Sequence, residues 1–403
     1  MNRAGGKRAS AENLMGIDIK AMKILIASDA YIYQTNGVRN VVITLANGLK
    51  QLGHDVRVLA PANGRESFKK DGDCFIRSFP SFLYPDVRLC PVHSDPLIDE
   101  LEQWKPDLIH VHTEADMARL AFKIAAVTGA PVVITAHTDY ATYAFKRFHE
   151  SRPVRVTMKA FGKRFYRHAK AVVAPSEKAR RFAQLQPAAN RVTVIPNGIR
   201  LERYQKPVSP EEKAALFQRY GLTDNGCTLV MVTRVSREKN IMEILHYFPA
   251  LLRAVPEAQL FIAGDGPDRE RLEAYTAHNG LSERVRFAGR IEPDEVYRYY
   301  ALGDVFVSAS TFEVHSMTYL EAMACGLPLV CREDASLLHV LDNGENGFIY
   351  NTESGFVEAV SRILRDRPLR EAMHKRALEK ADEFSDRRFV ERTVALYEKV
   401  VGR

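Results

Sequence analysis

Short apolar runs alternate with amphipathic stretches along the first half of the chain. Buried strands are predicted for MKILIAS, DVRVLAP, DLIHVHT and PVVITAHT, and helices for residues 37–53 and 116–127. Strands that are apolar on both faces and separated by helices are typical of a parallel sheet that is covered on both sides. The chain from Met22 onward therefore predicts an α/β, Rossmann-like domain.

The same alternation begins again after residue 204. Strands are predicted for TLVMVTRV, QLFIAGDG, VRFAGRI, VFVSAS and PLVCRE, and helices for residues 240–254, 267–279, 293–301 and 317–325. This pattern predicts a second doubly wound domain. Because ligands of such sheets bind beyond the carboxyl ends of the strands, we expect a site in a central cleft that the two domains face.

Four segments follow from this pattern. Residues 1–21 lack an apolar run and predict a disordered extension. The first domain is expected over residues 22–198 and the second over residues 199–385. Residues 386–403 have a helical pattern and are expected to form a C-terminal helix that could dock back on the first domain.

Size and composition exclude several classes of protein. A chain of 403 residues exceeds what one core usually supports, and 46% hydrophobic with 27% charged residues is typical of a soluble protein. No apolar run is long enough for a transmembrane helix, and the N-terminus lacks the apolar stretch of a secretory signal. Five scattered cysteines without a CxxC spacing favour a reduced, cytoplasmic compartment over a zinc site.

The positive charge is concentrated in one segment. Residues 145–182 hold 12 basic and 2 acidic residues, whereas the whole chain carries a net charge of +7. Within this segment an apolar row and a basic row have helical spacing: Val154, Met158, Phe161 and Phe165, and Arg155, Lys159, Lys163 and Arg167. A basic amphipathic helix can lie on an anionic membrane surface, although its apolar row could instead pack on the sheet. Nucleic-acid binding is not expected, because no nucleic-acid module accompanies the patch.

The stretch from Ser308 to Pro328 carries the densest candidate chemistry. A predicted strand leads into a loop with Glu313, and a helix then begins near Ser316 or Thr318 with Glu321 in its first turn. A strand that feeds a helix N-terminus makes an anion site, and flanking carboxylates suit the hydroxyls of a nucleotide sugar. The structural alternative for Glu321 is a capping box with Thr318.

Three cations and two glycines lie at other strand ends of the second domain. Arg234 and Lys239 flank a strand–helix turn, where they could clamp a diphosphate, although surface cations are common. The segment IAGDGP, with Gly264, lacks the third glycine of a dinucleotide fingerprint, so an NAD site is disfavoured. Gly289 and Arg290 end another predicted strand, where backbone groups could bind a base.

The first domain offers two candidates. Gly37 precedes a predicted helix, where it would allow close backbone approach to a ligand, although turn chemistry alone could require it. His137 directly follows the predicted strand PVVITA, where an imidazole could contact a sugar hydroxyl or a phosphate. The alternative for His137 is a structural histidine at a strand end.

Several of these segments together resemble the retaining glycosyltransferases of the GT-B fold. They are EVHSMTYLE followed by AMACGLPLV, and the segments TRVSREKN, IAGDGP and NGENGFIY. That large family includes sucrose-phosphate synthases and phosphatidylinositol mannosyltransferases. The segments HTDYATY and TYLEA, with the basic segment, are most similar to bacterial 1,2-diacylglycerol 3-glucosyltransferases.

The resemblance implies a role for each candidate. Arg234 and Lys239 would hold the donor diphosphate, Glu313 and His137 would act at the transferred sugar, and Glu321 would bind the ribose. The rest of the donor site would be formed by Gly37, Gly264, Arg290, Ser316, Met317 and Thr318. Family members usually have glycine where Ser316 stands, so we expect a changed loop path to affect sugar specificity.

The resulting hypothesis is an enzyme that transfers a hexose from a UDP-sugar to a membrane lipid hydroxyl, of the diacylglycerol type, with retention. It would be peripheral on the cytosolic face of the membrane and need no metal, because cations neutralise the diphosphate and Asp71-Gly-Asp73 lies in a polar loop. One alternative is a soluble or polymeric acceptor, such as a teichoic-acid-like chain or a sugar phosphate. Another is a non-catalytic subunit that binds a nucleotide sugar.

Overall fold

The computed structural model describes residues 20–32, 37–80, 88–137, 163–185, 187 and 189–402. Its contacts divide the chain into two compact units. Unit 1 comprises Met1–Val173, Ala183–Thr193 and Val390–Arg403, and unit 2 comprises Ala174–Phe182 and Val194–Phe389. Most of the extension expected over residues 1–21 lies outside the described residues.

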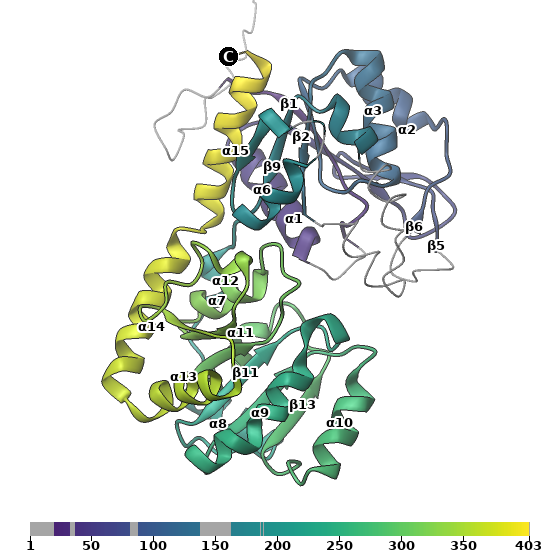
Figure 1. The fold of residues 1–403 in the computed structure, drawn as a ribbon. Coiled ribbons are helices and arrows are strands. Elements are labelled where there is room, and N and C mark those ends of the chain that lie inside the picture. Colours follow the sequence, from purple (N-terminus) through teal and green to yellow (C-terminus); the bar gives the residue numbers. More distant parts are fainter. Residues whose placement is uncertain are drawn as a thin grey trace, which may run out of the picture. The chain divides into compact units, whose positions relative to one another are not determined.

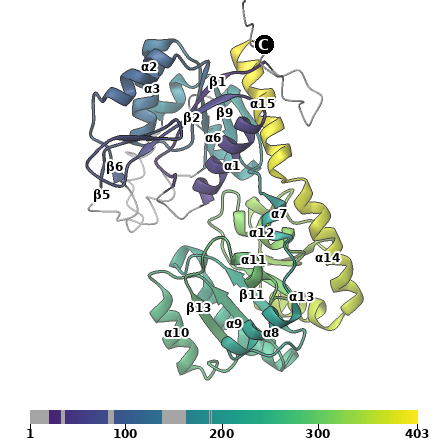
Figure 2. The same cartoon turned by 180° about the vertical axis from the view of Figure 1, so that it is seen from behind.

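Unit 1 is built on a parallel sheet. Its described strands have the order β10-β9-β8-β7-β1-β2-β4-β3, with β3 antiparallel to β4. Helices α2 and α3 lie side by side in both views of the ribbon (Figures 1 and 2). The elements are β1 (Lys23–Ala27), α1 (Gly37–Gln51), β2 (Asp55–Pro61), β3 (Phe68–Lys70), β4 (Asp73–Ile76), β5 (Phe79–Pro80), β6 (Arg88–Leu89), α2 (Pro96–Trp104), β7 (Leu108–Val111), α3 (Asp116–Thr128), β8 (Val132–Thr135), β9 (Ala171–Ala174), η1 (Ala189–Arg191), β10 (Val192–Val194) and most of α15 (Asp386–Val401).

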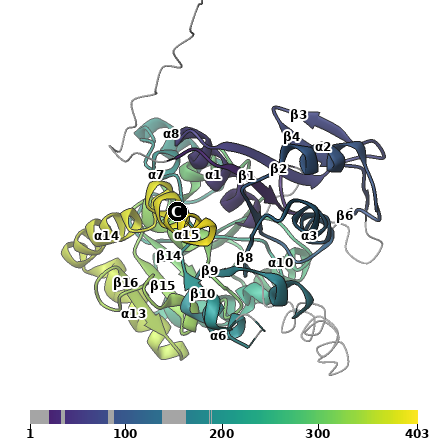
Figure 3. The same ribbon diagram turned by 90° about the horizontal axis from the view of Figure 1, so that it is seen from above.

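Unit 2 contains a second parallel sheet, with the described strands in the order β13-β12-β11-β14-β15-β16. Figure 2 shows α9 between α10 and α13, and Figure 3 shows α13 against β15 and β16. The elements are α6 (Glu177–Ala183), α7 (Leu201–Tyr204), α8 (Pro210–Arg219), β11 (Thr228–Val232), η2 (Arg237–Lys239), α9 (Ile241–Ala254), β12 (Gln259–Ala263), α10 (Arg269–His278), β13 (Val285–Gly289), α11 (Val296–Tyr300), β14 (Val305–Ser308), α12 (Met317–Ala324), β15 (Leu329–Arg332), η3 (Ala335–Leu337), β16 (Gly347–Tyr350), α13 (Glu353–Arg365) and α14 (Arg367–Asp382).

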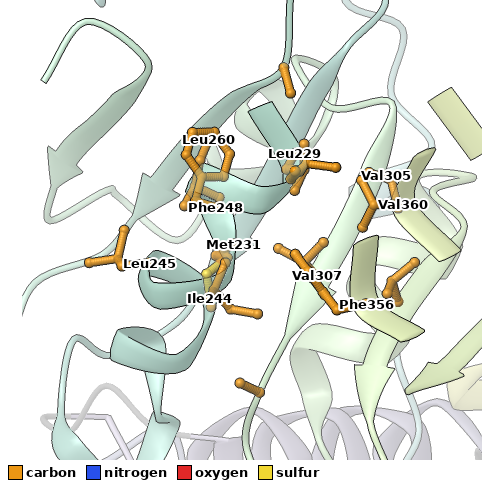
Figure 4. Packing of buried hydrophobic residues seen from close by; sticks show 14 of the residues in the cluster. Leu229, Met231, Ile244, Leu245, Phe248, Leu260, Val305, Val307, Phe356 and Val360 are labelled. Carbon is orange, nitrogen blue, oxygen red and sulfur yellow. The ribbon is translucent and has the colours of Figure 1, made fainter. Parts of the chain in front are cut away.

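Both faces of the unit 2 sheet are buried, which explains why its strands are continuously apolar. Successive side chains of a strand point to opposite faces, so Val305 and Val307 join one core cluster and Phe306 joins the other. In the first cluster, Met231 of β11 lies beside Ile244 of α9 (Figure 4). The sheet is therefore fixed from both sides, and its strand ends form a rigid base for the loops that follow.

The expected Rossmann-like halves are confirmed, and two local expectations are corrected. Lys239 lies in the short 3₁₀ helix η2, two residues before α9 begins at Ile241. Helix α12 begins at Met317, with Ser316 as its N-cap residue, so Glu321 lies in the second turn and not in the first. Within the described ranges, no helix combines the length and apolar content needed to cross a bilayer.

Candidate active site

Three loops at the carboxyl ends of β11, β12 and β13 are tied together by backbone hydrogen bonds. Thr233 N–H donates to the Ala263 carbonyl at 3.0 Å, and Gly264 N–H donates to the Gly289 carbonyl at 2.9 Å. Gly264 has φ +141°, and a Cβ there would lie 1.8 Å from the Thr233 carbonyl oxygen. Only glycine allows this approach, so IAGDGP is a packing motif that holds the loops in place.

Lys239 and Glu313 meet beside this edge of the sheet. Lys239 Nζ lies 2.5 Å from Glu313 Oε1, although the two residues are 74 positions apart in sequence. With Thr318 of α12, both residues line a cavity of about 10 Å³ next to β11 and β14. The structure thus brings one predicted phosphate ligand, one predicted sugar ligand and the first turn of α12 to the same place.

Glu313 is an ionised carboxylate although it is only slightly exposed. Burial alone would raise its pKa, but the charge and hydrogen bond of Lys239, with smaller contributions from Ser310 and Lys178, leave the pKa below its ordinary value. A negative charge is therefore held near the N-terminus of α12, where the carboxylate can accept hydrogen bonds from hydroxyl groups.

The loop that carries Glu313 is fixed by two residues that the sequence did not single out. Ser176 Oγ donates to the Val314 carbonyl at 2.6 Å, and Lys178 Nζ donates to the Thr311 carbonyl at 2.9 Å. Lys178 also pairs with Asp334 at 2.8 Å. These contacts span more than 130 positions, and no local sequence signal could have revealed them.

Glu321 is buried and already accepts two hydrogen bonds. Tyr204 Oη donates to its Oε1 and Tyr300 Oη donates to its Oε2, each at 2.9 Å. Burial raises the pKa of Glu321, while the two tyrosines and Arg203 oppose that shift. The capping-box alternative with Thr318 is wrong, because Glu321 is too far along α12 to reach its N-cap residue.

The first turn of α12 remains an anion site by its geometry. Ser316 makes no side-chain cap to the helix, and its Oγ lies 3.0 Å from the Thr318 hydroxyl. The leading backbone N–H groups, which include those of Met317 and Thr318, have no partner within the helix. The preceding residue, His315, is buried against Phe384, and burial lowers its pKa to about 4.

Two predicted cationic ligands lie at strand ends on either side of β12. Arg234 follows β11 by two residues and is exposed, and Arg290 directly follows β13 and is exposed too. Strand ends β11 and β13 flank β12 in the sheet. Both side chains can therefore reach a ligand over this edge, although neither contacts the Lys239–Glu313 pair in an interaction that the structure describes.

In unit 1, Gly37 is the first residue of α1 and is exposed. His137 follows the end of β8 by two residues, and its Nε2 lies 3.0 Å from Nδ1 of His112. His112 was not singled out in the sequence, although its place directly after β7, next to β8 in the sheet, is a signal that could have found it. No metal-binding arrangement of three or more His, Cys, Asp or Glu side chains is found among the described residues.

Unit 1 also contains a large hollow of about 1160 Å³. Its walls come mainly from α3, the helical residues 163–168 and the end of α15. Apolar side chains, among them Phe122, Phe165 and Val400, share the lining with the five basic residues Arg119, Arg164, His168, Lys170 and Arg191 and with the carboxylates Asp107 and Asp116. The hollow thus combines an apolar wall with an excess of positive charge.

Residues 138–162, which include residues 145–162 of the predicted basic segment, lie outside the described residues. Its described part includes the helical residues 163–168, in which Lys163, Arg164 and Arg167 are exposed while Phe165 and Tyr166 are buried. In this part, therefore, the cations face solvent and the aromatic rings pack into unit 1.

Two Rossmann-like halves with these strand-end loops define a glycosyltransferase of the GT-B fold. Residues 35–203 match the model of Glycosyltransferase Family 4, and residues 212–380 match the model of Glycosyl transferases group 1. The chain is 30% identical to the alpha-monoglucosyldiacylglycerol synthase of Streptococcus pneumoniae, over 85% of this chain and 78% of that protein. It is 28% identical to the enzyme of the same name from Acholeplasma laidlawii, over 88% and 92%.

The chain belongs to the glycosyltransferase family of these relatives, and it is an enzyme. Solved structures agree on the fold. HepE of Anabaena in complex with UDP-glucose superposes with a TM-score of 0.72 at 21% identity, over 95% of this chain and 100% of that chain. Sucrose-phosphate synthase of Thermosynechococcus elongatus superposes with a TM-score of 0.74 at 19% identity, over the same fractions.

Proposed function

We propose that this enzyme transfers a hexose from a UDP-sugar to the hydroxyl of a diacylglycerol-type lipid, with retention of the α configuration and without a metal. The observation that carries the proposal is the Lys239–Glu313 pair beside the first turn of α12. It places a cation, a carboxylate and free helical N–H groups within reach of one ligand. A diphosphate attached to a sugar has the matching anionic and hydroxyl groups.

The donor would be held as follows. An ammonium group has three donors, so Lys239 can keep Glu313 and still bind a phosphate oxygen. Arg234 would add a second cation at the same sheet edge, and the N-terminus of α12 would face the charge that develops on the departing phosphate. Glu321, whose oxygens have further lone pairs, would accept from the ribose hydroxyls.

Two observations support a lipid acceptor. The relatives from Streptococcus pneumoniae and Acholeplasma laidlawii are both named alpha-monoglucosyldiacylglycerol synthase. The hollow of unit 1 offers an apolar wall for acyl chains and basic side chains for phosphates of the membrane surface. His137, in the same unit, would contact the donor sugar.

The test is UDP release from purified protein, with a panel of UDP-sugars and with diacylglycerol vesicles as the acceptor. We expect one UDP-sugar to give release that depends on diacylglycerol, and a glycolipid whose new linkage is α by NMR. A β linkage would contradict retention. Release that needs a soluble glycerol-phosphate polymer and ignores the vesicles would instead support the polymeric acceptor.

Glu313→Gln tests the pair at the centre of the proposal. The substitution keeps the shape of the side chain but removes the charge, so we expect kcat to fall by about 100-fold or more. Glu283→Gln is the matched control, because Glu283 is an exposed carboxylate in the same unit. Equal activity of both variants would exclude a catalytic role for Glu313, and a wild type without turnover on every donor would favour the non-catalytic alternative.

Peripheral attachment to the membrane is tested by flotation with vesicles. We expect wild-type protein to float with anionic vesicles in a salt-sensitive manner and to stay behind with neutral ones. Reversing the exposed charges in the triple variant Lys163→Glu, Arg164→Glu and Arg167→Glu should weaken binding by about 100-fold, since each cation contributes about 1 kcal/mol near an anionic surface. Unchanged flotation of this variant would place the attachment elsewhere.

A further inference from the structure

Two buried histidines, His110 and His112, and the half-buried His137 form a row in unit 1. His110 lies in β7, His112 follows directly after that strand, and His137 follows the neighbouring strand β8. The rings of His110 and His112 are 4.1 Å apart between centroids, and the ring of His112 stacks on that of His137 at 5.2 Å. A polar contact between His112 and His137 joins Nδ1 of the first to Nε2 of the second, at 3.0 Å.

The surroundings of His112 determine where its proton lies. Burial and the two neighbouring histidines hold the pKa of His112 well below its ordinary value, so the ring is neutral and has one N–H. Its Nε2 is fully buried and finds no hydrogen-bond partner among the described residues. A buried N–H without an acceptor is more costly than a buried lone pair without a donor, so the proton belongs on Nδ1.

This assignment fixes the neighbouring ring. If His112 donates from Nδ1, then Nε2 of His137 must accept and cannot hold a proton of its own. We propose that His112 is a positioning residue that sets the tautomer and ring orientation of His137. Any hydrogen bond that neutral His137 donates to a ligand then comes from its Nδ1. That His137 meets the donor sugar rests on the proposed function; the tautomer itself does not.

The remaining histidine, His110, is held in place by two hydroxyl groups. His110 has both nitrogens occupied, with Nε2 2.7 Å from the Thr135 hydroxyl and Nδ1 2.5 Å from the Tyr397 hydroxyl of α15. Burial, followed by the charge of His137, lowers the pKa of His110 to about 3. Among the described residues, the titratable groups that act on His112 are His110 and His137, and neither is an anion. His110 is a matched control, because it is as buried as His112 and no hydrogen bond between it and His137 is described.

The tautomer is measured by ¹⁵N NMR of histidine-labelled, full-length protein without donor, with the His137 signals assigned by their loss in His137→Asn. We expect Nε2 of His137 to be unprotonated and Nδ1 to be protonated in the neutral ring. A proton on Nε2 of His137 would overturn the proposal. This measurement needs no turnover, so it decides the proposal even if every donor assay fails.

Variants separate positioning from a general packing role. His112→Leu should let both tautomers of His137 appear, lower kcat/KM by roughly tenfold and move the acid limb of the pH–rate profile to higher pH. The last effect follows because an N–H that faces Nε2 of His137 opposes a proton there. His112→Asn can supply an N–H near the position of Nδ1. It should therefore restore much of kcat/KM and bring the acid limb back toward its wild-type pH.

His110→Asn should lower the thermal stability of unit 1 and leave the acid limb where it was. An acid limb that moves equally in the His110 and His112 variants would refute the specific role of His112. If His112→Leu does not fold, the NMR measurement on wild-type protein still decides the tautomer.

Discussion

At the scale of single residues, the surroundings of a carboxylate decide what it can do. Glu313 and Glu321 lie eight positions apart, yet one is held ionised by Lys239 and the other is enclosed by two tyrosines. Sequence spacing identified both residues as candidates and suggested a loop for one and a helix for the other. It could not show Tyr204 or Tyr300, because those contacts depend on how α7, α11 and α12 pack together.

Tyr300→Phe tests how Glu321 is held. The loss of a hydrogen bond to the carboxylate should raise the pKa of Glu321 further, so less of it is ionised at a given pH. We expect UDP affinity to fall severalfold, and to fall more at pH 6 than at pH 8, as measured by calorimetry. Tyr299→Phe is the control, since Tyr299 stacks on Phe261 in the same cluster and makes no described contact with Glu321. An effect of equal size in the control would mean that packing alone is responsible.

Asp29 should make unit 1 less stable as the pH rises. Burial raises its pKa to about 7, against hydrogen bonds from Thr113 and the Met117 N–H. The folded state therefore retains a proton that the unfolded state loses above about pH 4, and stability falls between about pH 4 and 7. Asp29→Asn resembles the protonated form. The free energy of unfolding of this variant should therefore rise relative to that of wild type by on the order of 2 kcal/mol from pH 5 to pH 8. Denaturant titrations at both pH values measure the difference, and an advantage independent of pH would contradict the raised pKa.

At the scale of elements, apolar runs predicted the central strands well. The expected runs coincide with β1, β2, β7 and β8 in unit 1 and with β11 to β15 in unit 2. Buried parallel strands are apolar on both faces, and that property is written in their own residues. The starts of helices were less certain, because Met317 and Lys239 acquire their local conformation from the loops around them. The anchors of the Glu313 loop, Ser176 and Lys178, come from a distant segment and leave no local trace.

Gly264→Ala tests how tightly the loops after β11 and β12 approach each other. A methyl group would collide with the Thr233 carbonyl and would also strain a positive φ, so we expect a loss of more than about 3 kcal/mol in the free energy of unfolding. Gly280→Ala is the matched control, with φ +69° and open space around the added atom. It should cost only about 1–2 kcal/mol from backbone strain. Similar losses in the two variants would show that the close contact is not needed.

At the scale of the whole molecule, the chain order and the compact units do not coincide. The sequence pattern predicted a single passage between domains near residue 198 and a C-terminal helix that could dock back on the first domain. The described contacts assign Val390–Arg403 to unit 1, but they also assign Ala174–Phe182, from within the expected first domain, to unit 2. Periodicity shows where a helix lies, but it does not show which core the helix joins. For α15 the answer lies in tertiary contacts, such as the buried Tyr397 hydroxyl beside His110.

Removing residues 390–403 should therefore unfold unit 1 selectively. The truncation takes away Tyr397 and Val390, which are both buried, and exposes the apolar surface that they cover. We expect hydrogen exchange to become fast in β7 and β8 while β11 and β14 of unit 2 stay protected. Tyr397→Phe, which removes only the hydroxyl next to His110, should cost about 1 kcal/mol. Protection that persists in unit 1 of the truncated chain would contradict the assignment of this segment.

The same feature sets the order of events during synthesis. A ribosome releases the chain from its N-terminus, so Val390–Arg403, which completes unit 1, emerges only after the residues of unit 2. Unit 2 ends at Phe389 and can close first, whereas unit 1 must wait with part of its apolar surface uncovered until α15 leaves the exit tunnel. The half made first is thus finished last, and nascent unit 1 is where we expect chaperones to bind.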